Sequence, residues 1–220
     1  MDSAELAGAS SSRNAKDERR RSRMARIVTV EEGAHGAVKA VADDGSLFLF
    51  RACYLASARG VAPFDLPDDD LVAAVEATEA EFRASALLAR AEQFRAGLER
   101  KLAAKGLSRP ACRAALDRLE AAGLLSDLRY AGSWIRQRVR SHAEGPRSLS
   151  AALASRGIER AAATLAIQEA LESDKRFAML LTATRILVVK GADKASARAS
   201  LLTLGWRHDE VDDALEEMQV

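Results

Sequence analysis

The sequence predicts a mainly α-helical protein, with three tandem three-helix repeats in an elongated curved array behind a small N-terminal β-meander. The composition favours helix, because prolines number only four and aromatic residues make up 5% of the chain. One helical pattern also occurs three times at a spacing of about 50 residues, which is typical of stacked helical repeats. Its copies are Leu98–Leu107, Leu149–Ile158 and Ala197–Trp206.

Each copy of this pattern predicts a helix that ends at a glycine. Two apolar residues stand four positions apart, so they share one helix face. A glycine follows four positions later, and glycine adopts the left-handed conformation that ends many helices. An apolar residue comes directly after it. We therefore interpret three glycines as residues that end helices, namely Gly106, Gly157 and Gly205.

A second helix is predicted after each glycine, because small or apolar residues recur at the same four offsets in all three copies. This spacing predicts an amphipathic helix in each copy, with the same positions facing the core. The residues are Cys112, Ala115, Leu116 and Leu119, then Ala163, Ala166, Ile167 and Ala170, then Val211, Ala214, Leu215 and Met218.

The N-terminal part divides into two segments. Residues 1–24 contain the cluster Arg19–Arg23 and almost no large apolar side chains, which predicts a disordered basic tail. The alternative is a tail that contacts nucleic acid through its phosphates. Residues 25–67 are interpreted as a small β-segment and a linker. About three strands are expected, and 51–67 is expected to be the connection.

The predicted strands of this segment are rich in β-branched and aromatic residues. They are Ile27–Val30, Val38–Val41 and Leu47–Phe50. The turn Asp43–Ser46 contains a glycine that can supply the positive φ of a hairpin. Three short strands are marginal by themselves, so one face should pack against a helix.

The three repeats are predicted at 68–124, 125–172 and 173–220. Asp68–Asp70 should open the first helix, since carboxylates favour the positive end of the helix dipole. A stripe through Leu71, Val75 and Phe82 predicts its buried face. A break is expected around residues 78–85, because one helix reaching Gly106 would be unusually long.

The boundaries inside the repeats follow from local signals. Ser108 is expected to cap the next helix, with Pro110 in its first turn. The second and third repeats each open with a Ser-Asp cap, a basic residue, an aromatic residue and alanine. These openings, Ser126–Ala131 and Ser173–Ala178, predict helices at about 127–141 and 174–190.

The sequence contains no recognisable catalytic or metal-binding pattern. Its three histidines are scattered, and no nucleophile elbow, phosphate loop or HExxH motif is present. Cys53 and Cys112 have no CxxC spacing, and no apolar run is long enough to span a membrane. We therefore expect a monomeric cytoplasmic protein that is not an enzyme and has no cofactor.

Charge is distributed unevenly along a chain whose net charge is only +1. The middle repeat is strongly basic, whereas residues 61–82 and the C-terminus are acidic. Arginine dominates, and its guanidinium suits carboxylates and phosphates equally. An acidic protein partner, DNA and an ordinary solvated surface all remain open. The aromatic residues Tyr130, Trp134 and Phe177 are either core or base-stacking residues.

Three runs of residues resemble the RecX family, regulators of the RecA recombinase. They are Leu98…Leu102…Lys105-Gly106, Gly123–Asp127…Tyr130-Ala131…Ile135-Arg136…Arg138, and Gly145…Leu149…Leu153…Arg156–Ile158. The resemblance covers about residues 85–220 well. The segment with Arg26-Ile27 and Asp44-Gly45…Phe48 resembles an N-terminal extension found in some members.

This resemblance implies a non-enzymatic modulator of RecA that acts in DNA repair, homologous recombination and the SOS response. It implies binding in the groove of the RecA filament on single-stranded DNA, with inhibition of filament extension, ATPase, strand exchange and co-protease activity. Duplex DNA is a further candidate partner. The alternative function is a helical DNA-binding protein that acts independently of RecA. The expected partner-binding residues are Arg129, Arg136, Arg138, Arg140, Arg147, Arg156, Arg160, Lys101 and Lys105.

Overall fold

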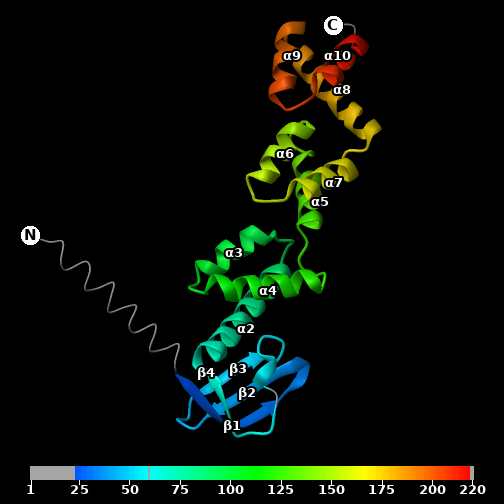
Figure 1. Ribbon diagram of the computed structural model, residues 1–220. Helices are drawn as coiled ribbons and strands as arrows, with labels where there is room; N and C mark the ends of the chain where they lie inside the picture. Colours follow the sequence, from blue (N-terminus) through cyan, green and yellow to red (C-terminus); the bar gives the residue numbers. More distant parts are fainter. Residues whose placement is uncertain (1–22, 59, 219–220) are drawn as a thin grey trace, which may run out of the picture. The chain divides into compact units, whose positions relative to one another are not determined.

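The computed structural model describes residues 23–58 and 60–218, and within this range it contains nine α-helices and one four-stranded sheet (Figure 1). The chain divides into two compact units. The first runs to Leu87 and includes Glu99–Ala122, and the second comprises Leu88–Leu98 and everything from Gly123 onward. The mainly α-helical class with a small N-terminal sheet is confirmed. The predicted tail lies outside the described residues, except for Arg23 and Met24.

The sheet is antiparallel, with the strand order β3-β2-β1-β4. Its strands are β1 (Met24–Glu32), β2 (Ala37–Ala42), β3 (Leu47–Arg51) and β4 (Phe64–Pro67). Short 3₁₀ turns lie at Ala34–Gly36 and Ala56–Ala58.

The expectation of about three strands was wrong, because the segment predicted as a connection supplies β4. Its four residues pair with Met24–Ile27 on the free side of β1. A strand of four residues that ends in proline has too little pattern to be recognised from sequence. The hairpin turn is confirmed, with Gly45 at a φ of 83°.

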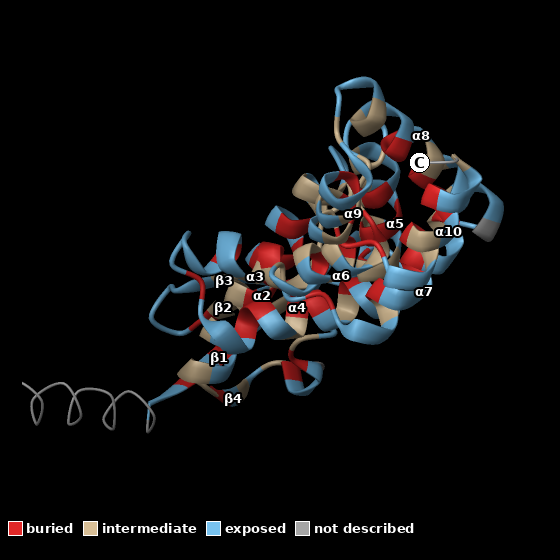
Figure 2. Cartoon of the chain, turned by 90° about the horizontal axis from the view of Figure 1, so that it is seen from above, coloured by how far each residue is buried: buried red, intermediate tan, exposed pale blue. Residues whose placement is uncertain are grey.

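One face of the sheet packs against the first helix, as expected for so small a sheet. Ile27, Val38 and Phe50 are buried in a single cluster with Leu71 and Ala74 of α2 (Asp68–Leu88). Figure 2 colours the chain by burial and shows buried stretches in α2. The helix begins at Asp68, and its first turn is acidic as predicted.

Helix α2 is continuous through residues 78–85, so the predicted break there was wrong. The chain instead leaves the helix after Leu88 and begins α3 at Arg95. The predicted stripe was wrong at Phe82, which is 76% exposed. The helix buries alanines, which are small enough for close packing and are weak signals in a hydrophobicity pattern. These alanines are Ala74, Ala77, Ala80 and Ala84.

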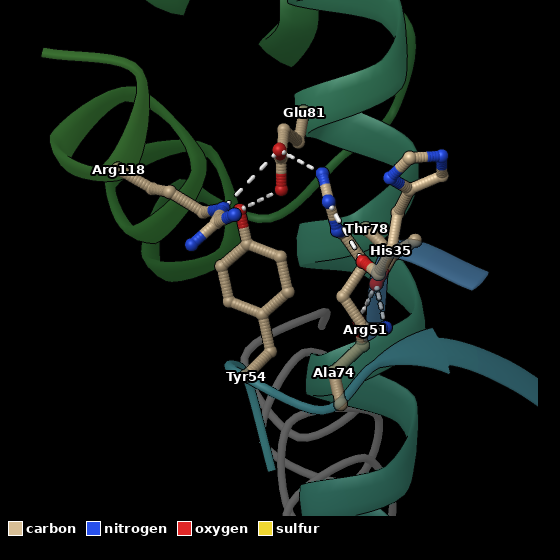
Figure 3. Close-up of polar contacts among 7 residues, drawn as sticks. All are labelled: His35, Arg51, Tyr54, Ala74, Thr78, Glu81 and Arg118. Atoms are coloured by element: carbon tan, nitrogen blue, oxygen red, sulfur yellow. Dashed lines mark hydrogen bonds and ion pairs between the residues drawn. The ribbon is translucent and has the colours of Figure 1, made fainter. Parts of the chain in front are cut away.

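A carboxylate on α2 holds the first unit together (Figure 3). Glu81 is only 6% exposed. One of its oxygens accepts from Arg51 Nη1 at 2.5 Å and from Arg118 Nε at 3.2 Å. The other accepts from the Tyr54 hydroxyl at 2.7 Å. Buried charge is tolerated where it is paired and hydrogen-bonded, and this carboxylate is both.

The same network includes backbone groups around Arg51. The Arg51 N–H donates to the Thr78 hydroxyl at 2.9 Å, and its guanidinium donates to the His35 carbonyl at 3.0 Å. The Thr78 hydroxyl in turn donates to the Ala74 carbonyl within α2. The network therefore joins the end of β3, the following loop, α2 and α4.

Helices α3 (Arg95–Ala103) and α4 (Arg109–Ala121) complete the first repeat. Gly106 between them has a φ of 85°, in agreement with its predicted role. Ser108 occupies the N-cap position of α4, but the prediction that it caps the helix was wrong. Its hydroxyl donates to the Glu76 carboxylate at 2.5 Å and accepts no bond from an N–H of the helix.

The second and third repeats each contain three helices. They are α5 (Asp127–Arg138), α6 (Pro146–Ala154) and α7 (Arg160–Ala170), then α8 (Ser173–Val189), α9 (Lys194–Thr203) and α10 (His208–Glu217). Gly157 and Gly205 have φ values of 85° and 87°. The first three predicted offsets are buried in all three repeats, whereas the fourth is partly exposed at Ala170 and Met218.

The two predicted Ser-Asp caps differ. The Ser126 hydroxyl accepts from the Arg129 N–H at 3.3 Å, which confirms the cap of α5. Helix α8 begins one residue earlier than predicted, so that Glu172 occupies its N-cap position. Helix ends vary by one or two residues with local hydrogen bonding, so sequence patterns locate them only approximately.

The second and third repeats are joined by backbone contacts in the second unit. The Gly145 N–H donates to the Leu204 carbonyl at 2.8 Å, and the Arg147 N–H donates to the Gly205 carbonyl at 3.1 Å. The Trp206 indole N–H donates to the Ala143 carbonyl at 2.9 Å. The segment that opens α6 is thus held against the end of α9.

Candidate functional site

The predicted arginines of α5 lie on two different flanks of the helix. Arg129 and Arg136 are seven positions apart, so they share one flank, and Arg140 continues it just beyond the helix end. Arg138 is four positions from Trp134 and lies on another flank with it. The predicted set is therefore not one uniform face.

Three of the predicted arginines are engaged within the chain. Arg129 donates to the Glu92 carboxylate at 2.9 Å and to the carbonyls of Gly123 and Leu124, both at 2.9 Å. These bonds satisfy backbone acceptors at the turn that precedes α5. Arg129 thus has a structural role that its sequence position did not reveal.

The other two engaged arginines lie beside Trp134. The Arg138 guanidinium donates to Glu144 at 2.6 and 3.1 Å, and this hydrogen bond raises the pKa of Arg138. The Arg156 guanidinium lies 4.5 Å from the centre of the Trp134 ring and donates to the Ala152 carbonyl at 2.6 Å. A cation over an aromatic face is a stabilising arrangement.

Four predicted arginines of the middle repeat are exposed and form no ion pair or side-chain hydrogen bond with any residue that the structure describes. An unpaired guanidinium can bind a partner without first breaking an internal bond. These residues are Arg136, Arg140, Arg147 and Arg160. Lys101 and Lys105 are also exposed, but they belong to the other compact unit.

The aromatic residues are mainly structural. Phe94 and Tyr130 pack with ring centres 4.8 Å apart, and Tyr130 and Trp134 lie against the core of the second repeat. Phe177 remains 38% exposed. Because Arg156 lies over the Trp134 ring, that face of the ring is already occupied.

A further groove in the second unit was not anticipated from the sequence. It measures about 520 Å³ and is lined by residues of α6, α7 and α8 and by Arg207 at the N-cap of α10. Three arginines border it, namely Arg147, Arg176 and Arg207. Arg176 and Arg207 are far apart in the sequence, so only the folded chain brings them to one groove with α6 and α7.

The described residues contain neither a candidate metal site nor a membrane-spanning helix. No group of three or more His, Cys, Asp or Glu side chains could hold a metal ion there. Helices that are long and apolar enough to cross a membrane are also absent from those residues. Cys112 is buried on the core face, as predicted, and burial raises the pKa of its thiol.

The Glu81 network predicts an unusual alkaline titration. Burial and the bond to Glu81 raise the pKa of Tyr54 above the ordinary 10.0. Because the folded pKa is the higher one, this stabilising contribution is complete below pH 10.0 and is lost as the pH rises further. In a Tyr130→Phe variant, tyrosinate absorbance should rise only with unfolding, since the chain contains two tyrosines. Ionisation of Tyr54 near pH 10.0 in the folded protein would contradict this.

Comparison with known proteins identifies a family domain in the middle repeat. Residues 126–170 match the model described as RecX, second three-helix domain. The regulatory protein RecX of Pseudomonas fluorescens is 43% identical over 83 residues, which is 38% of this chain and 53% of that protein. RecX of Xanthomonas oryzae pv. oryzae (strain MAFF 311018) is 39% identical over 85 residues, covering 39% and 52% of the two chains. The chain spans about half the length of the curated relatives it matches.

Solved structures share the fold over a longer range. A crystal structure of regulatory protein RecX superposes with a TM-score of 0.68 at 17% identity, covering 87% of this chain and 99% of the other. RecX from Lactobacillus salivarius gives a TM-score of 0.60 at 20% identity, covering 66% and 97% of the two chains. Residues 126–170 therefore match a RecX domain, the chain is similar to RecX proteins over about half of their length, and it shares the fold of solved RecX structures.

Proposed function

We propose that this protein is a non-enzymatic regulator of RecA, in which the unpaired arginines of the middle repeat bind the RecA filament on single-stranded DNA. The observation that carries the proposal is the exposed group Arg136, Arg140, Arg147 and Arg160 in residues 126–170, which match the family domain. Free guanidinium groups suit both carboxylates of a protein filament and phosphates of its DNA.

Binding in the groove of the filament is the mode that this scaffold suits best. Helical repeats present long surfaces built from many helix faces, and such surfaces suit extended partners better than small metabolites. Binding there would limit filament extension, and with it ATPase, strand exchange and co-protease activity. We place this activity in the cytoplasm, where the protein acts as a monomer.

The decisive experiment reverses two unpaired charges. In Arg136→Glu/Arg140→Glu, inhibition of RecA ATPase on single-stranded DNA should weaken by about 100-fold, because each reversal replaces attraction by repulsion. Arg138 is left intact, since its bond to Glu144 belongs to the fold. ATPase rates titrated with each variant measure the effect.

The matched control makes the same change of charge in the third repeat. Arg185 and Lys190 are exposed, so Arg185→Glu/Lys190→Glu should keep both the fold and the inhibition. If the Arg136/Arg140 variant is folded and still inhibits fully, these arginines are not the binding residues.

DNA binding without RecA is the second candidate, and the same unpaired arginines support it. Arginines that neutralise phosphates release counterions, so affinity for bare duplex DNA should then fall steeply with salt. Steep salt dependence on duplex DNA, together with no effect on RecA ATPase, would favour this function over the first.

A further inference from the structure

We infer that the groove bordered by Arg147, Arg176 and Arg207 is a docking site for an acidic protein segment that inserts an apolar side chain between its carboxylates. This goes beyond the proposed binding of the filament, because Arg136, Arg140 and Arg160 do not line the groove and Arg147 is the member of that group that does. The site lies wholly in the second compact unit and combines residues of two repeats.

The shape of the groove suits a peptide segment. One wall is a face of α6 at helical spacing, and the opposite wall is a face of α7 with the same spacing. Apart from Gln168, the side chains between the arginines are small or apolar, and Ile167 among them is buried. A groove between two helices with an apolar floor is a common way to bind a segment through its apolar side chains. The walls are formed by Pro146, Ser150, Ala151, Ala154, Thr164, Ile167 and Gln168.

The charges of the groove select an acidic partner. Its lining contains three arginines and no carboxylate. Arg147 has no ion pair with any described residue, so its charge is available. Arg176 pairs with Glu210, while Arg207 donates to Asp209 at 2.8 and 3.1 Å. Neither carboxylate lines the groove, so each holds its guanidinium in place from outside and leaves other N–H donors for a ligand.

A protein segment fits the groove better than a nucleic acid. None of the lining residues is aromatic, so the groove provides no ring on which a base could stack. Its apolar floor would be left against sugar and phosphate groups. In a protein segment, carboxylates can pair with the arginines while an apolar side chain between them packs against the apolar lining.

Fluorescence anisotropy with the full chain tests this site. The probe is a fluorescein-labelled synthetic peptide that has leucines at helical spacing and glutamates at the positions between them. Arg147→Ser should weaken its binding by about tenfold through loss of the free cation. Ala151→Trp, at an exposed position, should have a similar effect because the indole fills the groove.

The control is Arg185→Ser, which removes an exposed arginine that does not line the groove and should leave peptide binding unchanged. Thermal melting confirms that each variant is folded. The inference fails if the folded Arg147 and Ala151 variants bind like the parent. It also fails if polyglutamate of equal charge binds as tightly as the peptide. A third contrary outcome is that Ala151→Trp weakens the binding of oligothymidine but not that of the peptide. None of these assays contains RecA, so their failure is distinct from failure of the proposed function.

Discussion

Replacing Gly145 with alanine should destabilise the second unit by about 2–4 kcal/mol, because the added methyl group has no room. A Cβ atom at this position would lie 2.5 Å from both the carbonyl carbon and the oxygen of Gly205. These are backbone atoms, so no side chain can rotate away. Relief requires the second and third repeats to separate, with loss of the Gly145–Leu204 hydrogen bond. Urea denaturation followed by circular dichroism measures the change.

Gly33→Ala is the matched control for this substitution. Both glycines have ordinary negative φ values, −79° at Gly145 and −107° at Gly33, so backbone strain is equal in the two variants. A Cβ atom at Gly33 would meet its nearest neighbour, the Ala37 Cβ, at an ordinary 3.6 Å. Stability should change by less than about 0.5 kcal/mol. Similar losses in both variants would show that crowding at the repeat junction is not the cause.

Replacing Glu81 with alanine should destabilise the first unit by about 2–3 kcal/mol. The substitution leaves the Tyr54 hydroxyl and two guanidinium groups without their shared acceptor. Arg51 and Arg118 are 30% and 40% exposed, so water partly replaces the lost carboxylate and keeps the cost below that of a fully buried pair. The midpoint of urea unfolding reports the loss.

The control for Glu81 lies on the same helix. Glu79 pairs with Arg83 at 2.5 Å, but both side chains are more than 40% exposed. Because exposed pairs four residues apart contribute little, Glu79→Ala should change stability by less than about 0.5 kcal/mol. If the two variants lose equal stability, the buried network is not the cause of the loss, because alanine is itself the better helix former.

Local signals were sufficient to predict the repeats. Gly106, Gly157 and Gly205 all have positive φ, and the apolar residues four positions apart that precede them are buried in every copy. These features depend on helix periodicity and on the conformational freedom of glycine, which act within a few residues. They were therefore readable in a single chain.

Features that depend on distant partners were not readable. Arg129 and Arg136 are alike in the sequence, yet one is bound to Glu92 and two carbonyls while the other has no described partner. Likewise, β4 exists because β1 offers it a free edge. The residues next to Arg129, Arg136 and β4 in the sequence do not reveal which arginine is paired or that the segment forms a strand.

The sequence by itself determined the helical class, the three repeats, their glycine ends and the basic character of the middle repeat. Only the tertiary structure decided which arginines remain free, where the Glu81 network forms and which arginines of the third repeat border the groove. The physical reason is one of range. Periodicity, capping and glycine conformation act between neighbours, whereas ion pairs and grooves form between residues that only folding brings together.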